Sequence, residues 1–322
     1  MVISVFVHAE PYTPKDSDVI AVSSKKIKTD FTKAQLSKLF SESQHVGNTE
    51  SNQGILKRYL EHKVSQSDDP DIHYFYARLL QREHQFDEAI RILSDVTDQA
   101  PQHVNAILLK ANLLMVNGKF DEALGQCLSL FGLASIETIS TCSLDVKSQN
   151  GELKQSYEGL QKIASSSSMS INTRHVLAEM AYRLGYTEQT LSYLSNVDLK
   201  TAPVSLVVLW ADAQLAQKNG SAVLSTLAVL TSENANLEDA ILLRLAQAEK
   251  VKSQSTKWQE QMAKRVTLRE LRQDTYHASD LAWYYLTINR NMTKAKYWAR
   301  INWQQAKLQS DKRLLELTGL IN

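Results

Sequence analysis

Side chains that could carry out chemistry are sparse in this chain of 322 residues, and they follow none of the spacings that catalysis requires. No serine stands in a G-x-S-x-G turn, and no glycine-rich motif that would bind phosphate occurs. The eight histidines are scattered, and no two lie three or four residues apart on one helix face, where metal ligands would be paired. The acidic segment before His73 is typical of a loop and helix cap. The sequence therefore predicts no enzyme activity, no cofactor and no bound metal.

Two cysteines, Cys127 and Cys142, carry the remaining reactive chemistry. Cys127 falls on an apolar helical stripe, which favours a packed thiol. If the two cysteines lie on consecutive antiparallel helices joined by the FGLAS turn, they sit at similar heights and a disulfide is geometrically accessible. Such a bond would form in an oxidising compartment. Both alternatives, two buried thiols and a disulfide, stay open at this point.

Positive charge is concentrated near the C-terminal end, although the formal net charge of the whole chain is only +1. Residues 250–313 hold 14 Lys and Arg against five Asp and Glu, together with Trp258, Trp283, Trp298 and Trp303. Basic residues interleaved with aromatic ones can bind nucleic acid. Here the aromatic residues recur at helical spacing, which favours a core. We therefore predict no nucleic-acid partner, and a basic face that is solvated or meets an acidic partner or a membrane surface.

A repeated sequence motif indicates which secondary-structure elements position these residues. FDEAI at 86–90 and FDEAL at 120–124 stand 34 residues apart, and each is preceded by an apolar stripe at helical spacing and a polar turn. Small residues recur at matching places, Ala77 with Ala111 and Ala89 with Ala123, where paired helices would touch. The glycines at 118, 151, 185 and 220 extend the same period into later units. With only 10 Gly and 5 Pro in the chain, the composition also favours helix.

This pattern resembles the tetratricopeptide repeat, a helix–turn–helix of 34 residues. The resemblance implies an all-α fold, a right-handed α-solenoid of stacked helix–turn–helix repeats preceded by an irregular, extended N-terminal segment. We expect an extended segment with one short helix over residues 10–50 and repeats over 51–234, followed by degenerate helical repeats and a capping helix over 235–322. The core units are expected at about 70–102, 104–135, 137–165, 171–199 and 204–233.

In proteins of this family the first helix of each repeat lines a concave face. Aromatic, amide and charged side chains at the corresponding positions could hold an extended or helical peptide. The resulting candidate partner-binding residues are Tyr74, Arg78, Asn112, Asp145, His175, Glu179, Tyr182, Trp210 and Gln214.

The first nine residues, MVISVFVHA, resemble the end of a secretory signal. No apolar run approaches the ~20 residues that span a bilayer. The stretch that begins LLKANLLMVNGKFDEAL and the ending NWQQAKLQSDKRLLEL are also similar to exported bacterial tetratricopeptide-repeat proteins, some of which are encoded near metal-permease-like membrane proteins. We therefore expect a periplasmic, non-enzymatic scaffold that binds a protein or peptide, with a membrane protein of the envelope as one candidate partner. The alternatives are a cytoplasmic regulatory module and an accessory protein of a metal-transport system.

Overall fold

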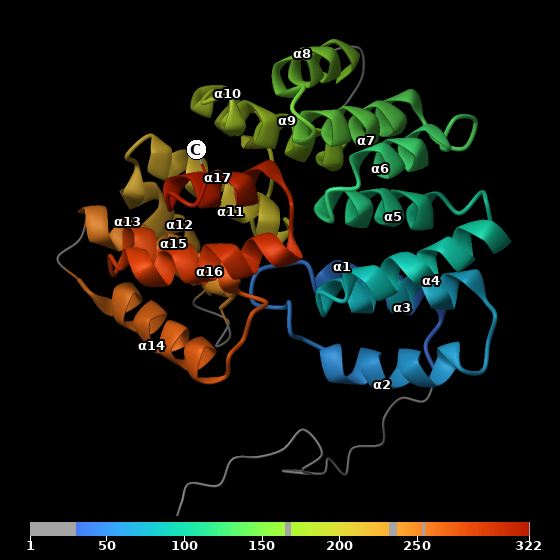
Figure 1. The fold of residues 1–322 in the computed structure, drawn as a ribbon, viewed down its shortest axis with the longest axis horizontal. Helices are drawn as coiled ribbons and strands as arrows, with labels where there is room; N and C mark the ends of the chain where they lie inside the picture. Colours follow the sequence, from blue (N-terminus) through green and yellow to red (C-terminus); the bar gives the residue numbers. More distant parts are fainter. Residues whose placement is uncertain (1–29, 165–168, 232–236, 253–254, 322) are drawn as a thin grey trace, which may run out of the picture.

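Helices and their connections make up the part of the chain that this computed structural model describes, residues 30–164, 169–231, 237–252 and 255–321 (Figure 1). Consecutive helices pack side by side as stacked pairs, so the prediction of an all-α solenoid is confirmed. The expected signal remnant at residues 1–9 and the extended stretch up to residue 29 lie outside the described residues.

Five helix pairs form the middle of the stack. The first helices of neighbouring pairs contact one another in a continuous row, and each second helix packs against its own first helix. The pairs are α3 (Pro70–Arg82) with α4 (Phe86–Gln99), α5 (Val104–Val116) with α6 (Phe120–Leu128), α7 (Ile136–Gln149) with α8 (Leu153–Ala164), α9 (Ile171–Arg183) with α10 (Thr187–Leu194), and α11 (Val204–Ala216) with α12 (Gly220–Thr231).

Short polar side chains begin several of these helices by accepting hydrogen bonds from free amides of the first turn. The Asp69 carboxylate accepts from the Asp71 amide at 3.0 Å, directly before Pro70, whose missing N–H costs nothing at this position. Ser135 and Ser170 accept in the same way, at 3.2 Å, from amides three residues later. These capping residues therefore mark in the local sequence where a helix pair begins.

The turns inside the pairs share one backbone feature, a residue with left-handed φ after the first helix. Glycine stands there in three of the five turns, as the period predicts, because it adopts this conformation without steric cost. Gly220, however, is not a turn residue, since it begins α12, and the left-handed position of that turn is Lys218. The backbone chain reversal, not the glycine, is what repeats every 33 or 34 residues. The five φ values are 54° at His84, 76° at Gly118, 103° at Gly151, 81° at Gly185 and 60° at Lys218.

The apolar core is divided into successive clusters along the stack, as expected when each pair contacts only its neighbours. The four alanines of the repeated motif, Ala77, Ala89, Ala111 and Ala123, are at most 1% exposed. Larger side chains there would push the helix backbones apart.

The C-terminal quarter continues the same row. It comprises α13 (Asp239–Lys252), α14 (Lys257–Leu271), α15 (Ala278–Thr287), α16 (Met292–Gln305) and the final helix α17 (Gln309–Leu317). Helices α11, α13, α15 and α17 contact one another in that order. The tryptophans of this region pack in its core, with Trp298 only 4% exposed, so their helical spacing reflects packing.

The N-terminal helices α1 (Lys33–Glu42) and α2 (Gln53–Val64) pack against α3. The segment between them runs from the side of α3 to the opposite part of the stack (Figure 1). There the amide of Val204 donates to the Gln44 carbonyl at 2.8 Å, and the amide of Gly47 donates to the Glu238 carboxylate at 2.8 Å. This segment therefore ties the first helices to α11 and α13.

A second connection comes from the segment between α16 and α17. The amide of Lys307 donates to the carbonyl of Val116 at 2.8 Å, where α5 ends. The amide of Gln309 donates to the side chain of Gln149 at 3.0 Å, and the Gln309 side chain donates back to the Gln149 carbonyl at 2.7 Å. The stack thus curls until its end meets its own early repeats (Figure 1).

Candidate functional site: the inner polar row

One polar residue from each first helix lies at an equivalent position, and together these residues form what we call the inner row. Successive members are 31 to 36 residues apart, close to the repeat length. Because the first helices neighbour one another, these polar residues recur along the stack at the spacing of the repeat. The inner row consists of Arg78 (α3), Asn112 (α5), Asp145 (α7), Glu179 (α9), Asp212 (α11), Arg244 (α13), Asp280 (α15) and Asp311 (α17).

At its N-terminal end the inner row is cationic and aromatic. The Arg78 guanidinium lies 4.8 Å from the ring centroid of Phe40 in α1 and 6.0 Å from that of Tyr74. The Tyr74 ring lies 5.0 Å from the ring of His103. Asn112, one repeat further, is exposed. Here the candidate residues keep access to solvent and present an arginine, an aromatic ring and an amide.

The middle of the inner row brings together Asp145, His175 and Glu179. The Gln149 amide donates to Glu179 at 3.0 Å, and Arg183 Nη1 lies 3.9 Å from the same carboxylate. Burial, reinforced by the charge of Glu179, raises the pKa of Asp145 to about 8, and burial lowers the pKa of His175. Two carboxyl groups thus share a partly desolvated place at which one arginine is the main cation.

Helix α17 faces this acidic pair. Burial raises the pKa of Asp311, to which Glu179 adds a smaller repulsive contribution, whereas the Asn302 amide donates to the Asp311 carboxylate at 2.7 Å. The Gln149–Gln309 hydrogen bonds lie beside it. The middle of the inner row is therefore in contact with the chain's own C-terminal segment.

Beyond α9 the inner row turns into an ion-pair network. Arg244 forms two hydrogen bonds of 2.8 Å to the carboxylate of Asp212 and lies 3.5 Å from Asp280. Tyr182 lies beside this network, and burial raises its pKa to about 12. Arg244 holds both carboxylates, so this part of the row is a structural brace as well as a polar surface.

The candidate residues on α11 have other surroundings. Trp210 is half-buried against the apolar cluster of α9 to α13, and Gln214 accepts a hydrogen bond of 2.9 Å from the Asn219 amide. The α11 member of the inner row is Asp212, which lies between them. Sequence reasoning missed Asp212 because it took Gly220 as the turn residue, whereas the left-handed position is Lys218, two residues earlier. It missed Arg244, Asp280 and Asp311 because the glycine-marked pattern fades after Gly220. The constant spacing of polar residues in first helices is the signal that would have found them.

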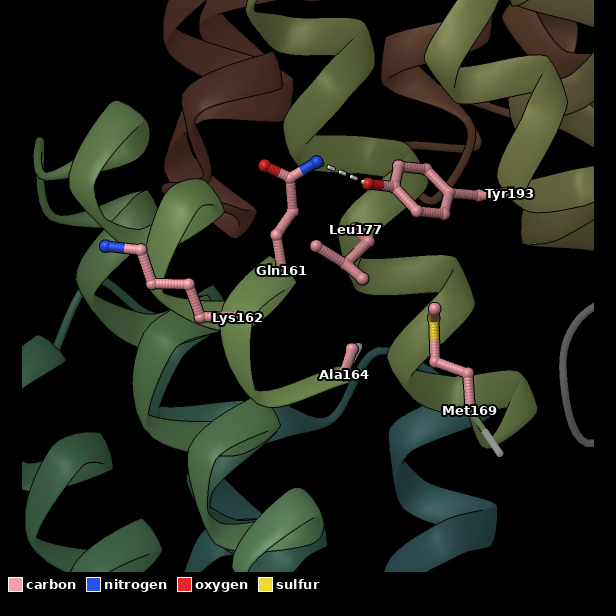
Figure 2. Close-up of a pocket in the computed structure, with 6 residues that line it drawn as sticks. All are labelled: Gln161, Lys162, Ala164, Met169, Leu177 and Tyr193. Carbon is pink, nitrogen blue, oxygen red and sulfur yellow. Dashed lines mark hydrogen bonds between the residues drawn. The ribbon is translucent and has the colours of Figure 1, made fainter. Parts of the chain in front are cut away.

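Outside the inner row, a pocket of about 470 Å³ opens between α8 and the α9–α10 pair (Figure 2). The Gln161 amide donates to the Tyr193 hydroxyl at 2.8 Å and to the Tyr157 hydroxyl at 2.9 Å. These hydrogen bonds join α8 to α10 across the pocket. Its lining residues are Gln161, Lys162, Ala164, Met169, Leu177 and Tyr193.

A disulfide joins Cys127 of α6 to Cys142 of α7, with the two Cα atoms 5.6 Å apart. It links the second helix of one pair to the first helix of the next, beside the buried residues Ala123 and Val146. Within the described residues, no group of three or more His, Cys, Asp or Glu side chains is placed to hold a metal ion. A search of the same part of the chain finds no helix long and apolar enough to cross a membrane.

The stacked pairs and the inner row define an α-solenoid repeat protein. Comparison with protein families then gives the family of the repeat: residues 80–128, from within α3 to the end of α6, match the tetratricopeptide repeat. The segment of residues 80–128, which holds both FDEA motifs, therefore matches this repeat as those motifs predict, and repeats of this family generally mediate protein–protein interaction.

The chain was also compared with solved structures and with curated proteins. Among solved structures, the chain is similar to the crystal structure of a tetratricopeptide repeat protein from Parabacteroides merdae. The two share 12% sequence identity over 85% of this chain and 93% of that chain, with a TM-score of 0.39. The comparison with curated proteins gives no match.

Proposed function

We propose that this chain is a non-enzymatic scaffold of the bacterial cell envelope that binds a protein or peptide partner through the inner row. One observation carries the proposal: every first helix contributes a polar residue at the spacing of the repeat, and neighbouring first helices contact one another. Such a row supplies hydrogen bonds at regular intervals, which suits an extended or helical peptide better than a small molecule.

The contact region that we favour is the N-terminal part of the inner row, at α3 and α5. Asn112 is exposed and Tyr74 and Arg78 are half-buried, whereas Asp212 and Asp280 are already paired with Arg244. Tyrosine and arginine are also the residue types that contribute most to binding energy at protein interfaces. The remaining candidates, Asp145, His175, Glu179, Tyr182, Trp210 and Gln214, would then shape and brace the face more than contact the partner.

The envelope location is supported by the Cys127–Cys142 disulfide, because such bonds persist in oxidising compartments. Mass spectrometry of the protein isolated from its native host tests this part. We expect a mature chain beginning after Ala9 and two cysteines that resist alkylation until a reductant is added. A chain that retains Met1 and is alkylated at once would favour the cytoplasmic alternative.

The binding role is tested by affinity capture from solubilised envelope fractions, followed by quantitative mass spectrometry. Asn112→Arg places a bulky charge on the inner row without disturbing buried packing. The control Gln155→Arg makes a similar change on the exposed face of α8. We expect a partner that is captured by the wild type and the control and reduced at least tenfold with Asn112→Arg. Equal capture by all three proteins would refute binding at this face.

A further inference from the structure

The end of α14 and the start of α16 carry an excess of positive charge, part of which forms no hydrogen bond or ion pair among the described residues. All five acidic side chains of residues 250–313 are engaged within the chain. By contrast, the side chains of Arg272, Arg290 and Arg300 have no hydrogen-bond or ion-pair partner among the described residues, and all three are exposed. The engaged acids are Glu260 with Thr256, Glu270 with Lys294, Asp274 with Arg269, Asp280 with Arg244, and Asp311 with Asn302.

Glu270 fixes how these two helices meet. Its carboxylate accepts hydrogen bonds from Lys294 at 2.9 Å, from the Tyr285 hydroxyl at 2.8 Å and from Trp298 Nε1 at 3.4 Å. Side-chain hydrogen bonds therefore link the last turn of α14 to the first two turns of α16. On the inner side of this seam, Val266 and Trp298 are buried in the C-terminal cluster.

Large apolar side chains are also exposed in the same two segments of the chain as the arginines. Leu271 is 81% exposed, Tyr297 is 58% exposed and Met292 is 41% exposed. Leu271 and Arg272 are adjacent in sequence, and Tyr297 and Arg300 lie three residues apart on one face of α16. We call these six residues, Leu271, Arg272, Arg290, Met292, Tyr297 and Arg300, the basic seam.

We propose that the basic seam docks onto the headgroup region of an anionic phospholipid bilayer. Arginine pairs with lipid phosphates, whereas leucine, methionine and tyrosine enter the boundary between headgroups and acyl chains. A purely acidic partner would pair with the arginines but leave Leu271 in water. Nucleic acid is bound through successive aromatic rings that are free for stacking, whereas the tryptophans of this region pack in the core and Tyr297 is the one exposed ring of the basic seam.

Charge elsewhere on the chain would orient the protein on such a surface. Residues 250–313 carry a net charge of +9 by residue count, so the remaining residues must carry −8 to give the total of +1. An anionic membrane attracts the C-terminal end and repels the rest, so the α3–α5 end of the inner row would stay accessible to a partner. The proposal goes beyond the scaffold function and does not depend on any contact made by the inner row.

Sedimentation of the full-length chain with vesicles tests the proposal. One set contains 30% phosphatidylglycerol in phosphatidylcholine and the other contains phosphatidylcholine alone. We expect binding to the anionic vesicles at low ionic strength that is largely lost in 0.5 M NaCl. Each arginine near an anionic surface contributes roughly fivefold, so the triple variant R272Q/R290Q/R300Q should bind about 100-fold more weakly. The variant L271S/Y297S should also bind more weakly, and its residual binding should stay sensitive to salt.

A matched control removes three exposed lysines from the other part of the stack, K119Q/K154Q/K200Q. It makes the same change in net charge and should bind anionic vesicles like the wild type. Circular dichroism of each variant establishes that it is folded. Absence of wild-type binding to anionic vesicles at low salt would overturn the proposal, as would equal loss in the control. Self-association that the arginine triple variant abolishes, without vesicle binding, would instead identify a second copy of the chain as the occupant.

Discussion

The acidic pair in the middle of the inner row offers the sharpest test of the electrostatic reasoning. The perturbation is Asp145→Asn, which keeps the side-chain shape but removes one of the two carboxyl groups beside Arg183. A buried carboxyl with a raised pKa binds its proton more tightly in the folded chain than in the unfolded one. The loss of folding stability that Asp145 causes is therefore absent below about pH 4, near the pKa of this carboxyl in the unfolded chain. It grows as the pH rises towards the pKa of about 8 in the folded chain.

The size of the effect follows from that shift. A carboxyl whose pKa rises from 3.8 to about 8 on folding lowers the free energy of unfolding by about 4 kcal/mol at pH 7. Asp145 is only half-buried, and Arg183 can move towards it, so solvent and relaxation reduce this figure. We expect Asp145→Asn to be more stable than the wild type by about 1–2 kcal/mol at pH 8, and nearly equal to it at pH 4.

Urea denaturation at pH 4, 6 and 8, followed by circular dichroism, measures this difference. Both proteins retain Asp280 and Asp311, whose pKa values burial also raises, so the comparison isolates Asp145. The control Asp98→Asn removes an exposed carboxylate from α4, and its effect should not depend on pH in this way. A variant that is less stable than the wild type at pH 8, or whose difference from it does not change with pH, would refute the argument.

Four further changes test the packing of the fold. Lys218→Gly should raise the midpoint of thermal unfolding, because glycine adopts the left-handed turn at a gain of roughly 1 kcal/mol. Ala111→Leu should destabilise the chain by about 1–3 kcal/mol in urea, because no space exists between the helices there. Asp239→Asn should cost about 3 kcal/mol by the same assay, since the buried carboxylate pairs with Arg265 and Arg269. Reducing the Cys127–Cys142 disulfide should lower the free energy of unfolding by roughly 3 kcal/mol. The midpoint of thermal unfolding should therefore be lower when reductant is present.

Much of the local architecture is determined by the sequence alone. The FDEA motifs, the small residues at helix contacts and the capping residues Asp69, Ser135 and Ser170 each act within one repeat, so a single period reveals them. The same period assigned Asp145 and Glu179 to equivalent positions of successive first helices, and in the structure the two carboxyl groups interact. It misplaced the turn residue at Gly220, because a lysine at position 218 can adopt the left-handed conformation that the sequence assigned to glycine.

Only the tertiary structure decided how the stack closes and what its inner face contacts. The bonds of Gln44 to Val204, of Gly47 to Glu238 and of Gln309 to Gln149 join residues about 160 to 190 positions apart. They use backbone groups and single side chains, which leave no periodic trace in the sequence. The curvature that brings these groups together is the sum of small rotations between neighbouring pairs, and each rotation depends on how side chains of two repeats fit. For that reason the repeat could be read from the chain, whereas the closure of the stack and the packing of α17 against the inner row could not.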